Sequence, residues 1–302
     1  MTASALRGTC FGYAVEAPFP FAYLRAGSGD RLAVSIAPPD LAEREGRLVG
    51  EWRIPGDRPS HARLFADGER FRLWVDVAGW YEIDPTAPSV AVPAAEHPVR
   101  REERLFGVPT LLCFRARGDV PLHAAALEVE GGAVVLAAPR TFGKTTLAAG
   151  FVRRGYRLLS EDLTCVRLGP PAAVVPGPAV LRLRPDVAER LELPDGRRVV
   201  ADDARVRIAL GDDARGDCEP VPLRAVVFLR PGDGPRALER AEPAETIRDL
   251  HALSFHLQAP DDLRRSFDDA AALGATVAAW NLAYEPTLDG LDELVGWLAG
   301  RV

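Results

Sequence analysis

The feature that most constrains the fold is an eight-residue stretch, residues 138–145, that has the form of a phosphate-binding loop, GxxxxGK(S/T), with alanine at the first glycine position. A continuous apolar run, residues 133–137, precedes it and is long enough for a buried strand. Apolar residues at helical spacing follow it, and Gly155 suits the end of that helix. The sequence therefore predicts a strand, a loop and a helix, in the order that a phosphate-binding loop requires.

The residue types in this stretch indicate nucleotide binding. Backbone N–H groups at the start of the helix would face a phosphate, Lys144 would neutralise its β/γ oxygens, and the hydroxyl of Thr145 would hold Mg²⁺. The residues expected to line the nucleotide are Ala138, Pro139, Arg140, Thr141, Phe142, Gly143, Lys144, Thr145 and Thr146. Ala138 weighs against this, because its Cβ tolerates a positive φ poorly where glycine eases a tight turn. The alternative is a helix start that holds no nucleotide.

Two adjacent acids, Glu161 and Asp162, follow the next short apolar segment, residues 158–159, which we expect to return as a strand beside residues 133–137. Phosphoryl transfer needs a carboxylate that anchors Mg²⁺ and often another that orients the attacking hydroxyl. Adjacent acids also occur on solvated turns. Because this pair follows a phosphate loop by one short helix, we expect both acids to be functional.

His123 stands in an apolar strand, residues 122–129, and a hairpin signal at residues 130–132 would place that strand beside residues 133–137. This arrangement would bring the imidazole near Asp162 or the transferred phosphate. The alternative is a hydrogen-bonded core histidine. We expect His123 to support the active site.

Together, the histidine-bearing strand, the loop, the helix and the acidic pair resemble the HPr kinase/phosphorylase superfamily. The sequence is most similar to the HPr-kinase-like proteins of modified-peptide biosynthesis, including the lasso-peptide kinases. The resemblance extends over most of the chain, including residues 11–14 and 122–126. It implies that Lys144 is the loop lysine, that Thr145 is the metal-side hydroxyl, and that Glu161 stands where the family generally has aspartate. The extra methylene would shift a catalytic base by roughly 1 Å, which geometry-sensitive catalysis would notice.

The chain has 302 residues, 47% of them hydrophobic, which is enough for one large or two smaller domains. Residues 1–100 alternate short apolar strands with turn residues and predict a β-rich N-terminal domain. Residues 101–302 predict the HPr-kinase-like domain. Its strands beyond Cys165 are short and closely spaced, which indicates an α/β (α+β) fold with the loop on a mixed, largely antiparallel sheet, as in HPr kinase and carboxykinase-like cores.

The sequence also predicts the local structure of several other segments. The mixed charges of residues 100–104 predict a solvated helix start, and residues 211–217 predict a mobile acidic loop. Arg182 and Arg184 alternate along one strand and would face the same side, either as a clamp for an anion or as exposed edge residues. The aromatic residues of the N-terminal region are expected in the sheet core: Phe11, Tyr13, Trp52, Trp74, Trp80 and Tyr81.

Composition excludes several classes of protein. A net charge of −6 argues against nucleic acid as a partner held by general electrostatics. The four cysteines are dispersed and predict reduced cytosolic thiols. The sequence shows neither a signal-peptide core nor a run of about 20 apolar residues, so we expect a cytoplasmic protein without a membrane partner.

The predicted function is an ATP-dependent kinase that transfers the γ-phosphate to a hydroxyl of a peptide or peptide natural product, with serine implied by the resemblance. Thr145 and Asp162 would bind Mg²⁺, Glu161 would orient or deprotonate the hydroxyl, and His123 would support the acidic pair. A small-molecule hydroxyl kinase and a non-catalytic nucleotide-binding partner protein remain open. So does a homo-oligomer, because the family is often oligomeric.

Overall fold

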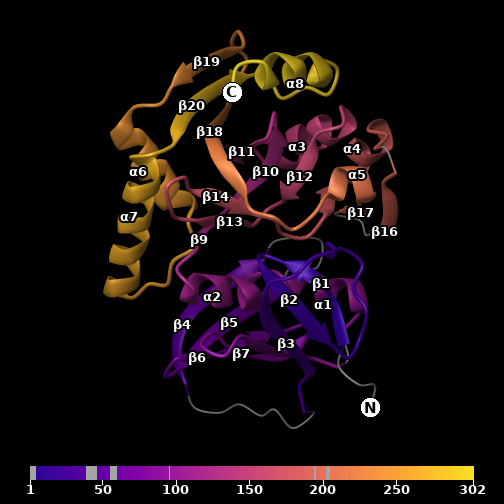
Figure 1. The fold of residues 1–302 in the computed structure, drawn as a ribbon, viewed down its shortest axis with the longest axis vertical. Helices are drawn as coiled ribbons and strands as arrows, with labels where there is room; N and C mark the ends of the chain where they lie inside the picture. Colours follow the sequence, from indigo (N-terminus) through magenta and orange to yellow (C-terminus); the bar gives the residue numbers. More distant parts are fainter. Residues whose placement is uncertain (1–4, 39–45, 55–59, 95, 194, 202–204) are drawn as a thin grey trace.

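The computed structural model describes residues 1–302 apart from residues 1–4, 39–45, 55–59, 95, 194 and 202–204. The chain forms two halves, with the N-terminal sheet in indigo and magenta below the C-terminal sheets in Figure 1. Across the described part of the chain, the structure contains no helix with the length and apolar character of a membrane span.

The N-terminal half is built on one eight-stranded sheet with the order β1-β2-β3-β8-β7-β6-β5-β4. Alternating residues of these strands are buried, as in Tyr13–Ala17, because one face of the sheet covers the core. The strands are β1 (Ala5–Cys10), β2 (Tyr13–Ala17), β3 (Asp30–Ile36), β4 (Arg47–Ile54), β5 (Ser60–Asp67), β6 (Arg70–Val75), β7 (Gly79–Asp84) and β8 (Ser89–Val92). The sequence did not predict β1, β4 or β8.

The aromatic residues of this half are divided between its two faces. Phe11, Tyr13 and Tyr81 are buried in the core, as expected. Trp74 and Trp80 are only half-buried, and with Arg63 and Phe65 they line a small outer hollow of about 250 Å³. The expectation of core burial was therefore wrong for these two tryptophans.

Two helices, α1 (Pro98–Leu105) and α2 (Val108–Ala116), pack against the first sheet and share its apolar core. The mixed-charge start of α1 is not solvated: Arg101 and Glu102 are buried. Both Glu102 carboxylate oxygens accept backbone N–H groups, from Ala22 at 2.7 Å and from Tyr23 at 2.8 Å, and this explains why a charged residue is buried there. The predicted boundary at residue 100 lies within α1, and the division into domains stays a prediction.

The C-terminal half is built on a nine-stranded mixed sheet with the order β12-β10-β11-β18-β14-β13-β9, to which β20 adds beside β18 and β19 beside β20. Strands β11, β18 and β20 run parallel, and the other pairs are antiparallel. The expected mixed α/β architecture is confirmed. The strands are β9 (Val120–Leu122), β10 (Ala124–Val129), β11 (Gly132–Ala137), β12 (Arg157–Ser160), β13 (Thr164–Arg167), β14 (Ala173–Val175), β18 (Val221–Pro231), β19 (Ala237–Arg240) and β20 (Ala278–Tyr284).

Helices cover both faces of this sheet (Figure 1). One core contains alternate residues of β10 and β11 with α3 (Lys144–Arg153) and α8 (Leu291–Ala299). The opposite core contains the intervening residues with α6 (Pro243–Leu253) and α7 (Pro260–Gly274). The central strands are apolar on both sides because both faces are covered.

The hairpin at residues 130–132 forms as predicted, with Val129 opposite Gly132 and positive φ at Glu130 and Gly131. The expected neighbour of β12 was wrong. This strand pairs with β10, which separates it from β11. Pairing with β10 brings Ser160, at the end of β12, opposite Ala126, so the acidic pair still reaches the edge of the sheet where β10 begins.

A small three-stranded sheet, β15-β17-β16, completes the fold beside α3. Its strands are β15 (Val180–Leu183), β16 (Arg197–Ala201) and β17 (Val206–Ala209), and α4 (Pro185–Arg190) follows β15. The segment expected to be a mobile acidic loop contains a short helix, α5 (Asp212–Arg215). Its Arg215 side chain donates to the carbonyl of Leu210, which fixes this turn to the strand before it.

Candidate functional site

The loop after β11 has the backbone of a tight turn that enters a helix. Gly143 precedes the first residue of α3 with φ of +82°, and a Cβ at this position would lie 2.7 Å from the hydroxyl oxygen of Tyr284. That hydroxyl donates to the carbonyl of Phe142 at 2.9 Å. Thr141 also has a positive φ, of +69°. Gly143 is therefore required by both its conformation and its surroundings.

Ala138, which replaces the first glycine, does not have a positive φ. Its side chain is buried in the core beneath α3, with 1% of its surface exposed. The conformational cost expected at this position therefore does not arise, because the left-handed conformations of the loop fall on Thr141 and Gly143.

The amine of Lys144 lies across the loop. It donates to the carbonyls of Ala138 at 2.7 Å and Pro139 at 2.9 Å, and it lies 3.1 Å from Nε2 of His123. Only 7% of the residue is exposed, and this burial lowers the pKa of Lys144 although Asp162 and Glu161 act to raise it. The amine is thus held in place and only weakly solvated.

His123 lies at the junction of β9 and β10 and joins Lys144 to Asp162. Its Nδ1 is 3.1 Å from the carbonyl oxygen of Asp162 and 3.2 Å from the carboxylate oxygen Oδ1. Since Nε2 faces an ammonium donor, the contacts fit a neutral ring with its hydrogen on Nδ1. Burial lowers the pKa of His123, which agrees with that form.

Glu161 is buried on the side of the loop where α3 begins. The hydroxyl of Thr145 donates to its Oε1 at 2.7 Å, and Nε of Arg182 donates to its Oε2 at 2.8 Å. Burial raises the pKa of Glu161, and Arg182 opposes this effect. A carboxylate beside a hydroxyl is a set of oxygen donors that Mg²⁺ accepts together with substrate phosphates. Among the described residues, there is no cluster of three or more His, Cys, Asp or Glu that could hold a metal ion.

Asp162 lies beside His123 and shares the Arg182 guanidinium with Glu161. Its backbone has a φ of +67°, an uncommon conformation for a residue other than glycine, and its side chain is 49% exposed. Burial acts to raise the pKa of Asp162, but Arg182 and His123 outweigh it and hold the pKa below its usual value. From the sequence we expected Asp162 and Thr145 to bind Mg²⁺ together, whereas the structure places the Thr145 hydroxyl against Glu161.

From the sequence, Arg182 could be either a clamp for an anion or an exposed edge residue. Its guanidinium contacts three carboxylates: Glu161, Asp162 at 2.9 Å, and Glu103 of α1 at 3.0 Å. Arg207, directly opposite on β17, also binds Glu103. Arg184, two residues along from Arg182, is exposed and pairs with Asp186. The expectation that both arginines alternate along one strand was wrong, because β15 ends at Leu183 and Arg184 is the residue that precedes α4. Arg182 is the one that contacts Glu103 of α1.

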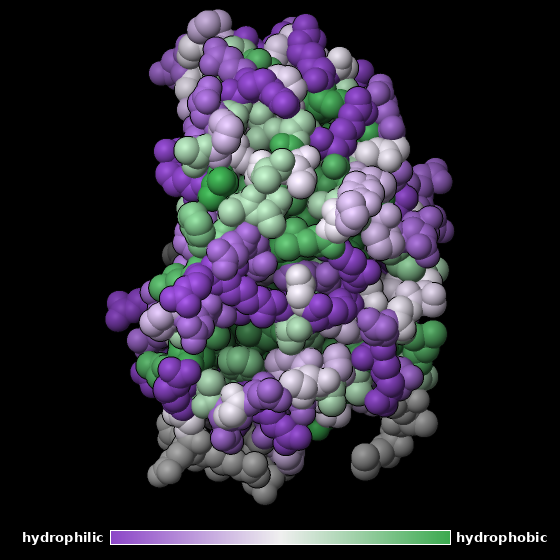
Figure 2. Space-filling model, turned by 60° about the vertical axis from the view of Figure 1, so that its left-hand side comes forward, coloured by the Kyte–Doolittle hydropathy of each residue, from purple (hydrophilic) through white to green (hydrophobic). Residues whose placement is uncertain are grey.

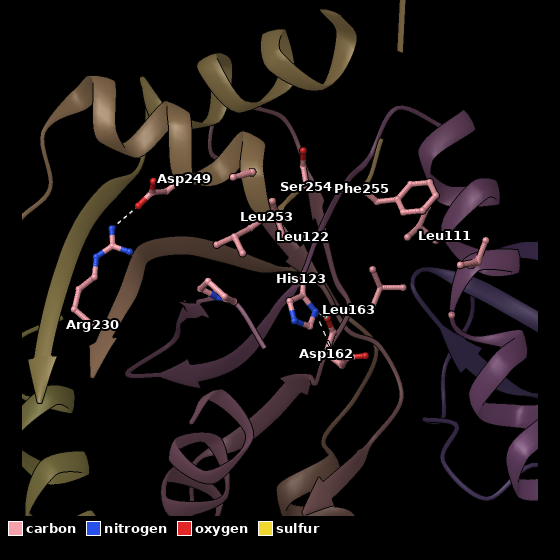
Figure 3. Close-up of a pocket in the computed structure, with 14 residues that line it drawn as sticks. Leu111, Leu122, His123, Asp162, Leu163, Arg230, Asp249, Leu253, Ser254 and Phe255 are labelled. Atoms are coloured by element: carbon pink, nitrogen blue, oxygen red, sulfur yellow. Dashed lines mark hydrogen bonds and ion pairs between the residues drawn. The ribbon is translucent and has the colours of Figure 1, made fainter. Parts of the chain in front are cut away.

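A cavity of about 560 Å³ opens beside His123 and Asp162. Figure 3 shows these two side chains next to each other, with Arg230 and Asp249 paired farther away. Figure 2, in which the α6–α7 side comes forward, shows hydrophobic residues above and below a hydrophilic band that crosses this face. The lining residues are Gly107, Val108, Leu111, Leu122, His123, Pro139, Asp162, Leu163, Arg230, Asp249, Ala252, Leu253, Ser254 and Phe255.

Comparison of the structure with solved structures gives a weak likeness, whereas the sequence comparisons give none. No family model matches the chain, and no curated protein matches it. Among solved structures, the Hpr(Ser) kinase/phosphatase from Coxiella burnetii matches with a TM-score of 0.33 and 11% sequence identity, over 60% of this chain and 93% of that chain.

Proposed function

We propose that the chain is an ATP-dependent kinase of the HPr-kinase-like type, which transfers the γ-phosphate to a hydroxyl of a peptide or peptide natural product. One observation carries the proposal. The Lys144 amine, the Thr145–Glu161 pair and the His123–Asp162 pair converge at the carboxyl end of β11, beside a loop that enters a helix. Amide groups at a helix start, one ammonium and two carboxylates form the set of groups that phosphoryl transfer uses. The peptide acceptor and serine are proposed from the sequence resemblance.

The contacts favour an exchange of the two acidic roles predicted from the sequence. Glu161 bonds the Thr145 hydroxyl, so Thr145 and Glu161 would hold Mg²⁺, which neutralises the charge that develops on the phosphate oxygens. Asp162 lines the cavity and would accept the hydrogen of the acceptor hydroxyl. His123 keeps the Asp162 carboxylate turned towards the cavity.

In the proposed transfer, a bond forms between the acceptor oxygen and the γ-phosphorus, and the bond from that phosphorus to the β–γ bridging oxygen breaks. ADP leaves with the bonding electrons, and the hydroxyl proton passes to Asp162. Because such transition states are loose, positioning the hydroxyl matters more than the strength of the base. An aspartate with a lowered pKa therefore suits this role.

Lys144 provides a direct test because it is the only lysine in the sequence. Burial lowers its pKa, so its neutral amine should form at lower pH than that of an ordinary lysine, and acylating reagents should modify it there. We expect MgATP to protect this side chain from modification. Mass spectrometry after labelling across a pH series measures both effects, and Lys144→Arg, which leaves the α-amino group as the amine that remains, is the matched control.

Turnover gives the second readout. Lys144→Ala should lower ADP formation by roughly 10²–10³-fold, since it removes a charge that stabilises the transition state. Modification of Lys144 that saturating MgATP does not slow would contradict nucleotide binding at this loop.

The non-catalytic partner protein is the second candidate, and one observation favours it. The Lys144 amine is bonded to two loop carbonyls and lies against His123, so these contacts must be given up before it can serve a phosphate. Binding of ATP without ADP formation, unaffected by Glu161→Gln, would support that candidate.

A further inference from the structure

The cavity beside Asp162 and His123 is built by both halves of the molecule. Val108 and Leu111 come from α2 of the N-terminal half, and Leu253 and Phe255 come from the end of α6 and the residues after it. Leu122 closes the wall from β9 and is almost fully buried. The ring of Phe255 is in turn backed by Trp52 of β4, with 6.1 Å between ring centroids. An apolar wall thus stands next to the groups that we propose to act on the hydroxyl.

The charged groups of the cavity are already paired. Of the described residues that line it, Arg230 is the one Lys or Arg, and its guanidinium binds Asn281, Glu245 and Asp249. The remaining charged groups are the carboxylates of Asp162 and Asp249. An acceptor that carries a phosphate or a carboxylate in this space would meet no unpaired lysine or arginine among the lining residues.

Two backbone N–H groups and one hydroxyl along the wall also have partners. The N–H of His123 donates to Leu253 at 2.7 Å, and the N–H of Phe255 donates to Pro121 at 3.1 Å. The hydroxyl of Ser254 donates to the carbonyl of His251. A sugar-like acceptor would have to bury several hydroxyls against this wall without partners, and each unpaired hydroxyl costs about 1–3 kcal/mol.

We propose that the acceptor carries a large apolar group next to the hydroxyl that receives the phosphate, and that this group fills the cavity against Leu111, Leu122, Leu253 and Phe255. The chemical class is a peptide in which the hydroxyl residue adjoins a leucine-sized or aromatic residue. A cavity of about 560 Å³ is large enough for an acceptor segment of that size. This inference rests on the proposed kinase activity and narrows its substrate.

A peptide library tests the inference with the unmodified protein. The probe is a set of ten-residue peptides with a fixed central serine and degenerate neighbours, incubated with MgATP. We expect phosphorylated products to be enriched in leucine, isoleucine, phenylalanine or methionine next to the serine, and depleted in charged residues there. Glycerol and glucose, as small polyols, should be poorer acceptors in kcat/KM by at least about 10-fold.

Two matched phenylalanine variants locate the effect. Phe255→Ala should lower kcat/KM by about 10-fold for a leucine-flanked serine peptide and change it little for an alanine-flanked one, because only the larger group reaches the missing ring. Phe267→Ala removes a ring on α7 that is 50% exposed and does not line the cavity, and it should leave both values unchanged. The library result does not depend on either variant folding.

The outcomes separate the two proposals. A library that prefers charged neighbours or shows no preference, or a polyol that is the better acceptor, would overturn the apolar subsite while leaving the kinase in place. A chain that neither binds ATP nor transfers phosphate would end the kinase proposal, and the subsite proposal with it.

Discussion

The two halves of the molecule use their charged residues differently. In the N-terminal half, buried charges serve the fold: Glu102 accepts two backbone N–H groups, and Glu96 binds Arg104 and the Tyr81 hydroxyl. In the C-terminal half, charges gather where strands end, around Lys144 and Glu161. The larger sheet thus holds the groups of the proposed chemistry, while the first sheet and its helices support them.

That support reaches the site through particular side chains. Glu103 of α1 binds Arg182, which in turn binds both Glu161 and Asp162. Arg25, almost fully buried in the N-terminal half, donates to the carbonyl of Leu158 in β12 at 2.7 Å, three residues before Glu161. The different roles of the two halves can therefore be tested by substituting residues that join the halves and residues that do not.

Among the substitutions that test the different roles of the two halves, the largest effect is expected at Arg182. Arg182→Met would leave Glu161, Asp162 and Glu103 without their shared cation, and the loss of one partner of a largely buried ion pair costs about 3 kcal/mol. We expect ADP formation to fall by more than 10-fold and the midpoint of urea unfolding to fall as well.

Arg184→Met is the matched control, because Arg184 lies two residues from Arg182 and forms an exposed ion pair with Asp186. It should change stability by less than about 1 kcal/mol and leave turnover intact. Equal effects of the two variants would contradict a specific role of Arg182.

A smaller effect is expected at Glu103. Glu103→Gln removes the charge through which α1 holds Arg182 and Arg207, while Arg182 keeps both site carboxylates. Stability should fall by about 1 kcal/mol, or about 2 °C in Tm, and ADP formation should fall less than in Arg182→Met. Calorimetry measures the change in stability, and a coupled assay measures ADP formation. If turnover fell as far as in Arg182→Met, the N-terminal half would be part of the catalytic machinery.

The smallest effect is expected in the turn between β6 and β7 of the first sheet. Val77, which follows β6, is 57% exposed, so Val77→Ser should change stability by no more than about 0.5 kcal/mol and leave ADP formation unchanged. A loss of turnover in this variant would show that the exposed surface of the support contributes to the site.

The parts of the structure that could be predicted from the sequence are those that local patterns determine. The apolar run before the loop, the helix after it and the Gly-Gly hairpin all occur, because strand length, helical spacing and turn chemistry are properties of neighbouring residues. The same patterns placed His123 within one strand, residues 122–129, which was wrong in this detail: β9 ends at Leu122, β10 begins at Ala124, and His123 lies between them. The roles assigned to the site residues stay predictions.

The missed features depend on contacts between distant segments. The pairing of β12 with β10 joins Leu158 to Leu127, 31 residues earlier, and the apolar pattern of β12 suits either neighbour. The difference between Arg182 and Arg184 depends on Glu103, 79 residues earlier. The burial of Glu102 depends on N–H groups of the segment before β3. Such partners lie far away in the sequence and cannot be predicted from the neighbouring residues. The local composition therefore predicted that a charged side chain is exposed to solvent, whereas in the folded chain it is buried and hydrogen-bonded.

The hydrogen bond from the Tyr284 hydroxyl to the Phe142 carbonyl has a consequence for how the chain folds during its synthesis. Tyr284 follows Phe142 by 142 residues and ends the strand beside β18. A ribosome-bound chain that has not yet exposed residues 278–284 carries the loop sequence without the contact that braces it. The loop would therefore take its final form only late in translation, after β20 has paired with β18.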